Sequence, residues 1–426
     1  MLVSERANMA TTNDWPAFTS PRGKSDLFLQ RSSPAEVPFL RSQSSKFSCQ
    51  ILTAASELRP LAAELGELSA AASEPNVFYE PWMLLPALDS FAQSGSFRFV
   101  CITATDHRGA RLLCGFFPFE VTDRYARAPL RTARLWNYLS FQWCVPLVRK
   151  KFEGPVFQTL LRWSKSNDFP CDLLELPSMP MEGPNSTAAI EELNSAGLVP
   201  YVRTQFTRAL LENIGDAENM LRSAIPGHKL KDYRRLERRL SDRGEVAYEE
   251  LDHSGDVDQW IEGFLALESA GWKGAAGSAI ACNPASRTFF TRATKSAFQQ
   301  QQLMMLRLTL NGRPIAYKCN FLRPPGSFSF KIAYDEEYRA FSPGVLLELE
   351  NIRLFQQRCD LQWMDSCADP GHFMANHLWK GRRSMQSWLV APRSGLPELA
   401  VAAMPLAKWA MRRVKSLIAI HPRRSA

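Results

Sequence analysis

The sequence lacks several patterns that would place it in a common class of protein. No apolar run reaches the roughly 18 residues that a membrane-spanning helix needs, and the first thirty residues contain no signal-peptide core. The chain has no P-loop, no G-x-G-x-x-G and no G-x-S-x-G, so the usual signals of nucleotide triphosphatases, dehydrogenases and α/β-hydrolases are missing. None of its nine cysteines forms a C-x-x-C pair. Scattered thiols of odd number suit a reducing cytoplasm, where we expect the protein to reside.

What the chain does contain is typical of a globular protein. Of its 426 residues, 45% are hydrophobic and 22% charged, and at roughly 150 residues per domain this length predicts two or three domains. The net charge is +8, and the excess lies in two segments. Residues 228–243 hold seven basic residues and three acids, and residues 404–426 hold six basic residues and no acid. An anionic partner should therefore meet one of these segments.

Composition and periodicity divide the chain into five parts. Residues 1–48 are rich in serine and proline and predict a disordered tail. We expect an N-terminal domain at 49–211, a basic connecting helix at 212–244, a C-terminal domain at 245–392 and a basic amphipathic tail at 393–426.

The hydrophobic patterns predict alternating helices and strands. In the N-terminal part they predict helices at 54–72 and 187–196 and strands at 97–105, 111–121 and 173–176, with a loop at 177–186. Later, strands are expected at 245–251, 303–310, 314–322, 327–334, 361–366 and 385–390, and helices at 217–243 (interrupted at Pro226-Gly227), 257–270, 285–299, 344–357 and 372–379. The dipeptide Asn311-Gly312 predicts a tight hairpin turn between two of these strands.

The most informative local feature is the end of the strand at 327–334. It leads through Ser342-Pro343-Gly344 into an apolar helix. The first N–H groups of a helix lack intrahelical partners, and the helix dipole favours negative charge there. The sequence therefore predicts a cradle for an anion such as pyrophosphate.

The order of elements from 245 to 392, together with the runs at 268–274, 312–316, 330–338 and 342–347, resembles the Gcn5-related N-acetyltransferase (GNAT) fold. These runs resemble most closely the BioF2-like (CelD-like) acetyltransferases, which carry two fused domains as the FemABX aminoacyltransferases do. The resemblance implies an α/β (α+β) protein with tandem GNAT-like domains, whose mixed, mostly antiparallel sheets are flanked by helices. The N-terminal domain would be a degenerate copy without a cofactor loop.

The same resemblance implies acetyl-CoA or another acyl-CoA as co-substrate, and no metal. The family's Arg-x-x-Gly-x-Gly/Ala loop corresponds to Arg339-x-x-Ser342-x-Gly344, so serine replaces the first glycine and Pro343 supplies no N–H. The implied cofactor-binding residues are Arg339, Ser342, Gly344, Val345 and Leu346.

The family reaction is a direct attack by an amine on the thioester, which needs a base for the amine and an acid for the leaving thiolate. Asp335 and Asp365 are the candidate bases, since each ends a predicted strand beside the loop. Asp335 suits a cap of the following turn almost as well. Tyr334 and Tyr338 are candidate acids, and packing is their alternative role.

Trp272, Lys273 and Lys331 are candidate substrate-binding residues, with packing for the tryptophan and solvent exposure for Lys331 as the alternatives. His372 and His377 stand five apart, which places them on different faces of a helix and argues against a zinc site. Cys367 has no obvious paired base and is interpreted as an inert thiol.

These observations predict an acyl-CoA-dependent N-acyltransferase acting on an amine of a sugar or cell-envelope precursor. Aminoacyl transfer from tRNA, with the basic helix contacting RNA phosphates, is one alternative, and no other nucleic acid is expected. A catalytically silent scaffold of a polysaccharide-synthesis complex is the other. The segment 406–420 combines an apolar face with a basic one. It suits either a peripheral contact with the inner face of the membrane or docking onto the protein itself.

Overall fold

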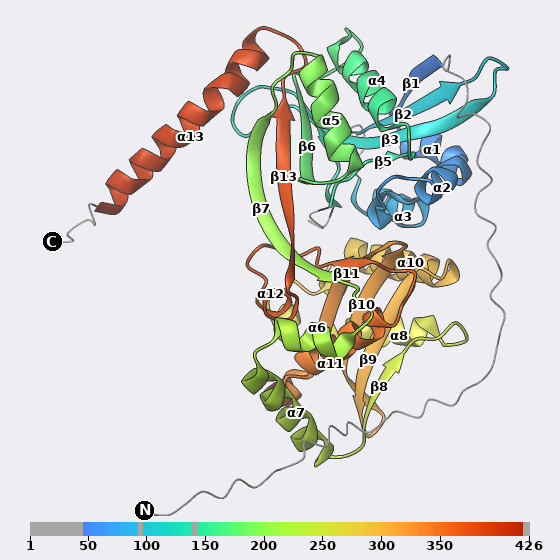
Figure 1. Cartoon of the computed structure of the whole chain (residues 1–426), viewed down its shortest axis with the longest axis vertical. Helices are drawn as coiled ribbons and strands as arrows, with labels where there is room; N and C mark the ends of the chain where they lie inside the picture. Colours follow the sequence, from blue (N-terminus) through green and yellow to red (C-terminus); the bar gives the residue numbers. More distant parts are fainter. Residues whose placement is uncertain (1–45, 93–96, 139–142, 421–426) are drawn as a thin grey trace, which may run out of the picture. The chain divides into compact units, whose positions relative to one another are not determined.

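The computed structural model describes residues 46–92, 97–138 and 143–420, and the strands in these ranges form one mixed sheet (Figure 1). The strands are β1 (Lys46–Leu52), β2 (Phe97–Thr105), β3 (Arg111–Thr122), β4 (Thr132–Leu135), β5 (Leu147–Val148), β6 (Leu173–Pro180), β7 (Tyr201–Glu212), β8 (Val246–Glu250), β9 (Leu303–Leu310), β10 (Arg313–Arg323), β11 (Gly326–Tyr334), β12 (Trp363–Asp365) and β13 (Gly381–Val390). Their order across the sheet is β1-β2-β3-β4-β6-β13-β7-β12-β11-β10-β9-β8, with β5 beside β3.

The helices lie between these strands in the sequence. They are α1 (Ala55–Leu58), α2 (Ala62–Ala70), α3 (Pro81–Phe91), α4 (Glu153–Lys165), α5 (Pro184–Ser195), α6 (Ala217–Ala224), α7 (Gly227–Ser241), α8 (Val257–Ala270), α9 (Trp272–Ala275), α10 (Pro284–Gln299), α11 (Pro343–Gln356), α12 (Phe373–Leu378) and α13 (Leu396–Ile420), with the 3-10 turns η2 (Arg59–Leu61), η3 (Val77–Tyr79), η5 (Ile280–Cys282) and η6 (Glu336–Phe341).

The strand order is symmetric about its centre. β1 to β4 pair antiparallel and β4 then pairs parallel with β6, while β8 to β11 pair antiparallel and β11 then pairs parallel with β12. The last strand of each half crosses to the other half: β7 pairs with β12, and β13 pairs with β6. Figure 1 shows β7 and β13 as long neighbours, and they pair antiparallel. The expected fold class, a mixed and mostly antiparallel sheet flanked by helices, is confirmed.

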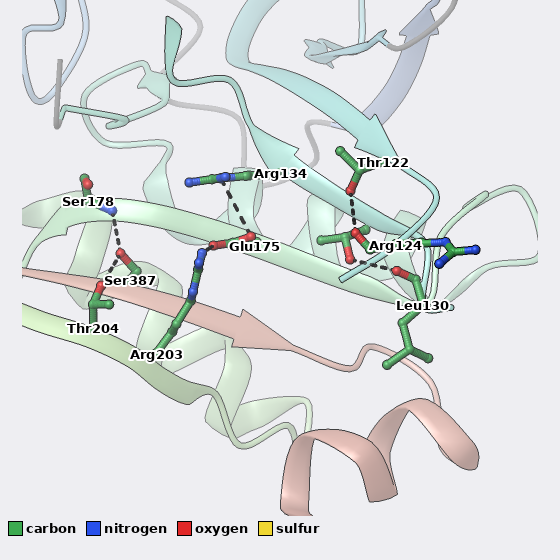
Figure 2. Close-up of polar contacts among 10 residues, drawn as sticks. Thr122, Arg124, Leu130, Arg134, Glu175, Ser178, Arg203, Thr204 and Ser387 are labelled. Atoms are coloured by element: carbon green, nitrogen blue, oxygen red, sulfur yellow. Dashed lines mark hydrogen bonds and ion pairs between the residues drawn. The ribbon is translucent and has the colours of Figure 1, made fainter. Parts of the chain in front are cut away.

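Polar side chains connect the exchanged strands β13 and β7 with the neighbouring strands of the N-terminal half (Figure 2). Ser387 on β13 accepts a hydrogen bond from the backbone N–H of Ser178 on β6 at 3.0 Å, and its hydroxyl lies 2.9 Å from that of Thr204 on β7. Beside them, buried Glu175 on β6 pairs with Arg203 of β7 and with Arg134 of β4. The exchange is thus fixed by specific side chains as well as by backbone pairing.

In the C-terminal half, each sheet face carries a different helix layer. Leu306 and Leu308 of β9 pack with Leu347 and Ile352 of α11 in one core cluster. Tyr317 on β10 points the other way, and its ring lies against Trp260 and Phe264 of α8. Alternating burial along the strands therefore supports helices on both faces.

Most predicted elements with strong periodicity are confirmed, including α8 and β9 with their predicted bounds. Asn311 and Gly312 both have positive φ, as the hairpin prediction required. The loop expected at 177–186 was wrong in part, because β6 continues to Pro180 beside β13. The sequence analysis missed α3 and α4. Pro86 lies inside α3 and obscured its helical pattern.

Both ends of the chain were predicted to be tails. Residues 1–45 lie outside the described residues, and β1 starts at Lys46 within the segment expected to be a tail. The C-terminal segment forms α13, in which Leu399, Leu406 and Trp409 are exposed and Val401 is buried. Among the described helices, none combines the length and the apolar character that crossing a bilayer requires.

Candidate functional site

The site begins where β11 leaves β12. These two parallel strands pair only from Gly326 to Phe328 of β11. Beyond that point, β11 carries one extra residue, Phe330, because Lys331 pairs with Cys319 and Ser329 pairs with the next residue of β10. Bulges of this kind bend a strand and occur often beside active sites. In the described residues, the stretch from Ser329 to Tyr334 has a strand partner on one side only, which leaves a backbone edge available to a ligand.

The predicted anion loop follows directly. Ser342 adopts the left-handed conformation, with φ 54° and ψ 50°, where a serine is strained and glycine would not be. A serine at the family's glycine position therefore preserves the backbone turn. Gly344 is buried, and a Cβ there would meet the Tyr334 ring at 3.3 Å. The side chain of Ser342 makes no cap hydrogen bond to α11, and the first turn of this helix contains no acidic residue.

Two basic residues, one in the last turn of α7 and one just after this helix, lie beside the loop. The guanidinium groups of Arg239 and Arg243, at the C-terminal end of α7, each lie 5.7 Å from the centre of the Phe341 ring. Phe341 immediately precedes Ser342, and Arg339 is exposed two residues before it. The sequence analysis located an excess of positive charge in this segment, and the end of the segment supplies that charge next to the loop. Tertiary contact, not sequence, reveals this neighbourhood.

The two candidate bases lie in different surroundings. Asp335 accepts the backbone N–H of Glu337 at 3.0 Å as the cap of η6 and pairs with Arg313 at 2.6 Å, which matches the capping alternative. Asp365 is fully buried, and its two oxygens pair with Arg208 at 2.7 Å and Arg383 at 2.8 Å. Because both oxygens are held by guanidinium groups, this environment favours a structural role for Asp365 over proton transfer.

The candidate acids flank the loop. Tyr334 packs against Gly344, and partial burial, with the nearby Glu336 carboxylate, raises the pKa of its phenol. It therefore stays protonated at neutral pH and is able to donate. The Tyr338 ring lies under the Arg313 guanidinium at 5.9 Å. Both tyrosines are thus near the start of α11.

The two candidate lysines come together against β11. Lys273 Nζ lies 3.0 Å from Glu268 Oε1 and donates to the Ile332 carbonyl at 3.2 Å. Burial, and then the neighbouring Lys273 charge, lowers the pKa of Lys331. Trp272, in contrast, is 61% exposed. The buried Glu268, which orders this group and also accepts the Ile280 N–H at 2.9 Å, was not singled out as a site residue.

A buried polar network under β10 was also missed. Lys318 Nζ lies 2.8 Å from Glu348 Oε2, and both side chains are at most 2% exposed. Glu348 accepts hydrogen bonds from Trp379 Nε1 at 3.1 Å and Asn351 Nδ2 at 2.9 Å, and Lys318 donates to Ser329 at 3.0 Å. A lysine within the apolar run of a central strand was the available signal in the sequence.

The surroundings of the histidines and of Cys367 bear on the metal and thiol interpretations. No group of three or more histidine, cysteine, aspartate or glutamate side chains that could hold a metal occurs within the described ranges. His372 caps α12, its Nδ1 accepting the Ala375 N–H at 3.2 Å. Burial raises the pKa of the Cys367 thiol well above its usual value, which disfavours a reactive thiolate.

Comparison with known proteins gives three findings. A family described as "Acetyltransferase (GNAT) domain" matches residues 227–372. No curated protein matches the sequence. Among solved structures, FemX is similar with a TM-score of 0.52 and 9% identity over 80% of this chain and 96% of that chain.

Two further structures are less similar. A conserved protein of unknown function from Bacteroides thetaiotaomicron VPI-5482 has a TM-score of 0.48 and 8% identity over 78% of this chain and 96% of that chain. A tandem GNAT protein from the clavulanic acid biosynthesis pathway has a TM-score of 0.40 and 12% identity over 82% of this chain and 100% of that chain. The family match covers the open edge of β11, the loop after it and α11. Residues 227–372 therefore form a GNAT-type acetyltransferase domain, the type of domain that transfers an acyl group.

Proposed function

We propose that the protein transfers an acyl group, most simply acetyl, from acyl-CoA to an amine of a sugar or cell-envelope precursor, as a cytoplasmic member of the BioF2-like group. One observation carries the proposal: an open strand edge ends in a left-handed turn and a helix start beside Arg239 and Arg243. Helix starts and guanidinium groups both bind phosphates. GNAT domains use acyl-CoA, whose pyrophosphate matches this chemistry.

In this arrangement the pyrophosphate contacts the segment from Arg339 to Leu346, and the amide-bearing arm runs back along the open edge of β11. Backbone N–H groups on that edge polarise the thioester carbonyl. Bound acyl-CoA supplies the activated acyl group. The acceptor amine attacks it, forming the new C–N bond and breaking the C–S bond. Tyr334 lies at the loop end of β11, beside the pyrophosphate, so the leaving thiolate takes its proton from the attacking amine by way of solvent.

Calorimetric titration with acetyl-CoA tests the cofactor site. Gly344→Trp should weaken binding at least about 100-fold, because the indole would fill the start of α11 where the phosphates bind. Gly66→Trp is the matched control, since a Cβ at Gly66 meets nothing within 4 Å. Arg243→Glu, on an exposed position, should weaken binding about tenfold at low salt and less at high salt.

Two results would reject the cofactor site. One is wild-type protein that binds no acyl-CoA. The other is Gly344→Trp protein that remains folded by circular dichroism and binds acetyl-CoA as tightly as Gly66→Trp does.

The fold similarity to FemX keeps aminoacyl transfer from tRNA as a second candidate. Several basic residues of α7 are exposed, among them Lys229, Lys231, Arg235 and Arg238, and could meet RNA phosphates. Salt-sensitive binding of aminoacyl-tRNA, together with no affinity for acyl-CoA, would favour this candidate. Absence of both activities would favour the silent scaffold.

We also propose that α13 touches the membrane surface. Its exposed Leu399, Leu406 and Trp409 offer apolar contact, and the exposed Arg413 lies 5.7 Å from the Trp409 ring. Trp409→Glu should abolish sedimentation with vesicles containing phosphatidylglycerol, and wild-type protein should not sediment with pure phosphatidylcholine. Equal sedimentation of the wild type and Trp409→Glu would contradict the contact.

A further inference from the structure

A cavity of about 390 Å³ lies beside the start of the β11–β12 pair, between segments from both halves of the sheet. It is large enough for a small polar ligand. Pro325 and Trp363 line it from the C-terminal half, and Glu74 and Trp143 line it from the N-terminal half. The other lining residues are Ser73, Pro75, Pro180, Glu182, Gly183, Leu210, Arg382, Arg383 and Ser384. None of these was a candidate site residue in the sequence analysis.

Glu74 is the chemically unusual group in this cavity. Its Oε2 accepts the backbone N–H of Asn185, in the first turn of α5, at 2.9 Å. Gly183 makes room for it: the residue has φ 133°, and a Cβ there would lie 2.5 Å from Glu74 Oε1. Burial raises the pKa of the Glu74 carboxyl to about 7. The fold thus holds, at the lining of a cavity, a carboxyl group that changes protonation state near neutral pH.

Nearby charges add smaller effects to that of burial. Arg383 on β13 lowers its pKa, and Glu153 on α4 raises it. Arg383 is already committed to Asp365 at 2.8 Å, and Arg382 donates to backbone carbonyls of Asn376, Trp379, Lys380 and Gly381. Glu182, also on the lining, adds negative charge at the rim. Among the described residues, Glu74 therefore has no ion pair with either guanidinium group of the cavity.

Aromatic rings form the opposite part of the lining. The Arg383 guanidinium lies 4.1 Å from the Trp363 ring and 5.1 Å from the Trp143 ring, so these three groups stack together. Trp143 is 2% exposed, and its Nε1 is buried with no hydrogen-bond partner in the part of the chain that the structure describes. A buried indole N–H usually has a partner. This indole N–H is therefore a donor whose hydrogen-bonding capacity is unused in a residue that lines the cavity.

We propose that this cavity binds an amino sugar, with its ammonium group at Glu74 and its ring against the tryptophan wall. An ammonium supplies the positive charge that Glu74 lacks, and an indole face suits the apolar face of a sugar ring. Ser73, Ser384 and the Arg383 guanidinium offer hydrogen bonds to ring hydroxyls. The inference rests on the proposed function in one respect: the bound amino sugar would be the acceptor.

The position of the cavity suits that role. β11 spans about 26 Å at roughly 3.3 Å per residue, with the anion loop after its end and Pro325 just before its start. An acyl-CoA arm running back from the loop along the open edge brings its thioester toward the cavity end of the strand. The acceptor and the acyl group thus approach the same part of β11 from opposite ends.

The test is calorimetric titration of the full-length protein with glucosamine at pH 6.5, in two buffers with different heats of ionisation. An ammonium beside Glu74 lowers the pKa of this carboxyl, so binding should release more than about half a proton per ligand. Glu74→Gln keeps an oxygen for the Asn185 N–H, and it should remove the proton release and weaken binding about tenfold or more. Glu191→Gln, at an exposed position of α5 outside the lining, is the matched control and should retain both. N-Acetylglucosamine, which lacks the ammonium, should bind weakly and release no proton.

The outcomes separate this inference from the cofactor proposal. Acetyl-CoA binding without glucosamine binding, or glucosamine binding unchanged in Glu74→Gln, would overturn the acceptor cavity and leave the acyl-CoA site intact. Glucosamine binding with proton release but no affinity for acyl-CoA would support the cavity and reject the proposed donor. Proton uptake on binding would also overturn the assignment, because an ammonium beside Glu74 lowers the pKa of this carboxyl and so releases protons.

Discussion

Glu348→Gln should lower the free energy of unfolding by about 3–5 kcal/mol, because it leaves the Lys318 ammonium buried without its counter-charge. The glutamine oxygen can still accept from Trp379 and Asn351. The loss therefore reports the charge and not the neutral hydrogen bonds. Urea denaturation followed by tryptophan fluorescence measures it as a lower midpoint.

Two further variants make this prediction specific. Glu350→Gln, two positions along the same helix, removes the partner of Arg353 in a pair whose side chains are each 22% exposed, and should lower stability by at most about 1 kcal/mol. The double variant Lys318→Met with Glu348→Gln removes both charges and should be more stable than Glu348→Gln alone. A double variant as unstable as the sum of its single changes would show that the pair is not coupled.

Asp365→Asn should be comparably destabilising, by about 3–5 kcal/mol, because Arg208 and Arg383 share this one buried carboxylate. Arg208 lies on β7 and Arg383 on β13, so Asp365 on β12 joins the two exchanged strands to the C-terminal half. Neutralising it removes the shared carboxylate charge from two guanidinium groups, one of them fully buried.

Glu175→Gln is the natural control for Asp365→Asn. Glu175 occupies the related position on β6 and also serves two arginines, but Arg134 and Arg203 are 39% and 41% exposed and remain hydrated when the charge is lost. Its effect should be about 1 kcal/mol. If Asp365→Asn unfolds at the wild-type urea concentration and binds acetyl-CoA normally but loses acyl transfer, then Asp365 is the catalytic base and the structural interpretation is wrong.

The helices and strands of the C-terminal half followed from local patterns. α8 keeps one apolar stripe of Trp260, Phe264 and neighbours, and Asn311-Gly312 accepts the positive φ of its turn. Such features depend on residues close in sequence, so periodicity and turn chemistry are enough to predict them. The turn from β11 into α11 was predictable for the same reason, because a strand, a turn and a helix start are consecutive in the chain.

The exchange of β7 and β13 was not predictable in this way. The sequence patterns predicted no strand here, whereas the structure forms β7 from Tyr201 to Glu212. Its N-terminal part is exposed in an alternating manner and gains its definition from β13, which lies far away in sequence. Strand pairing of this kind depends on the neighbouring strand that folding supplies, so the local β-propensity of the sequence does not predict it.

The sequence by itself determined the secondary structure around the loop and the residues, Arg339, Ser342 and Gly344, that form the turn into α11. Only the tertiary structure placed Arg239 and Arg243 beside that turn, surrounded Asp365 with two arginines, and enclosed Glu74 with Trp143 and Trp363. The physical reason is range. A turn depends on the φ and ψ angles of adjacent residues, whereas the charge, hydration and accessibility of a side chain depend on neighbours that folding brings from distant parts of the chain.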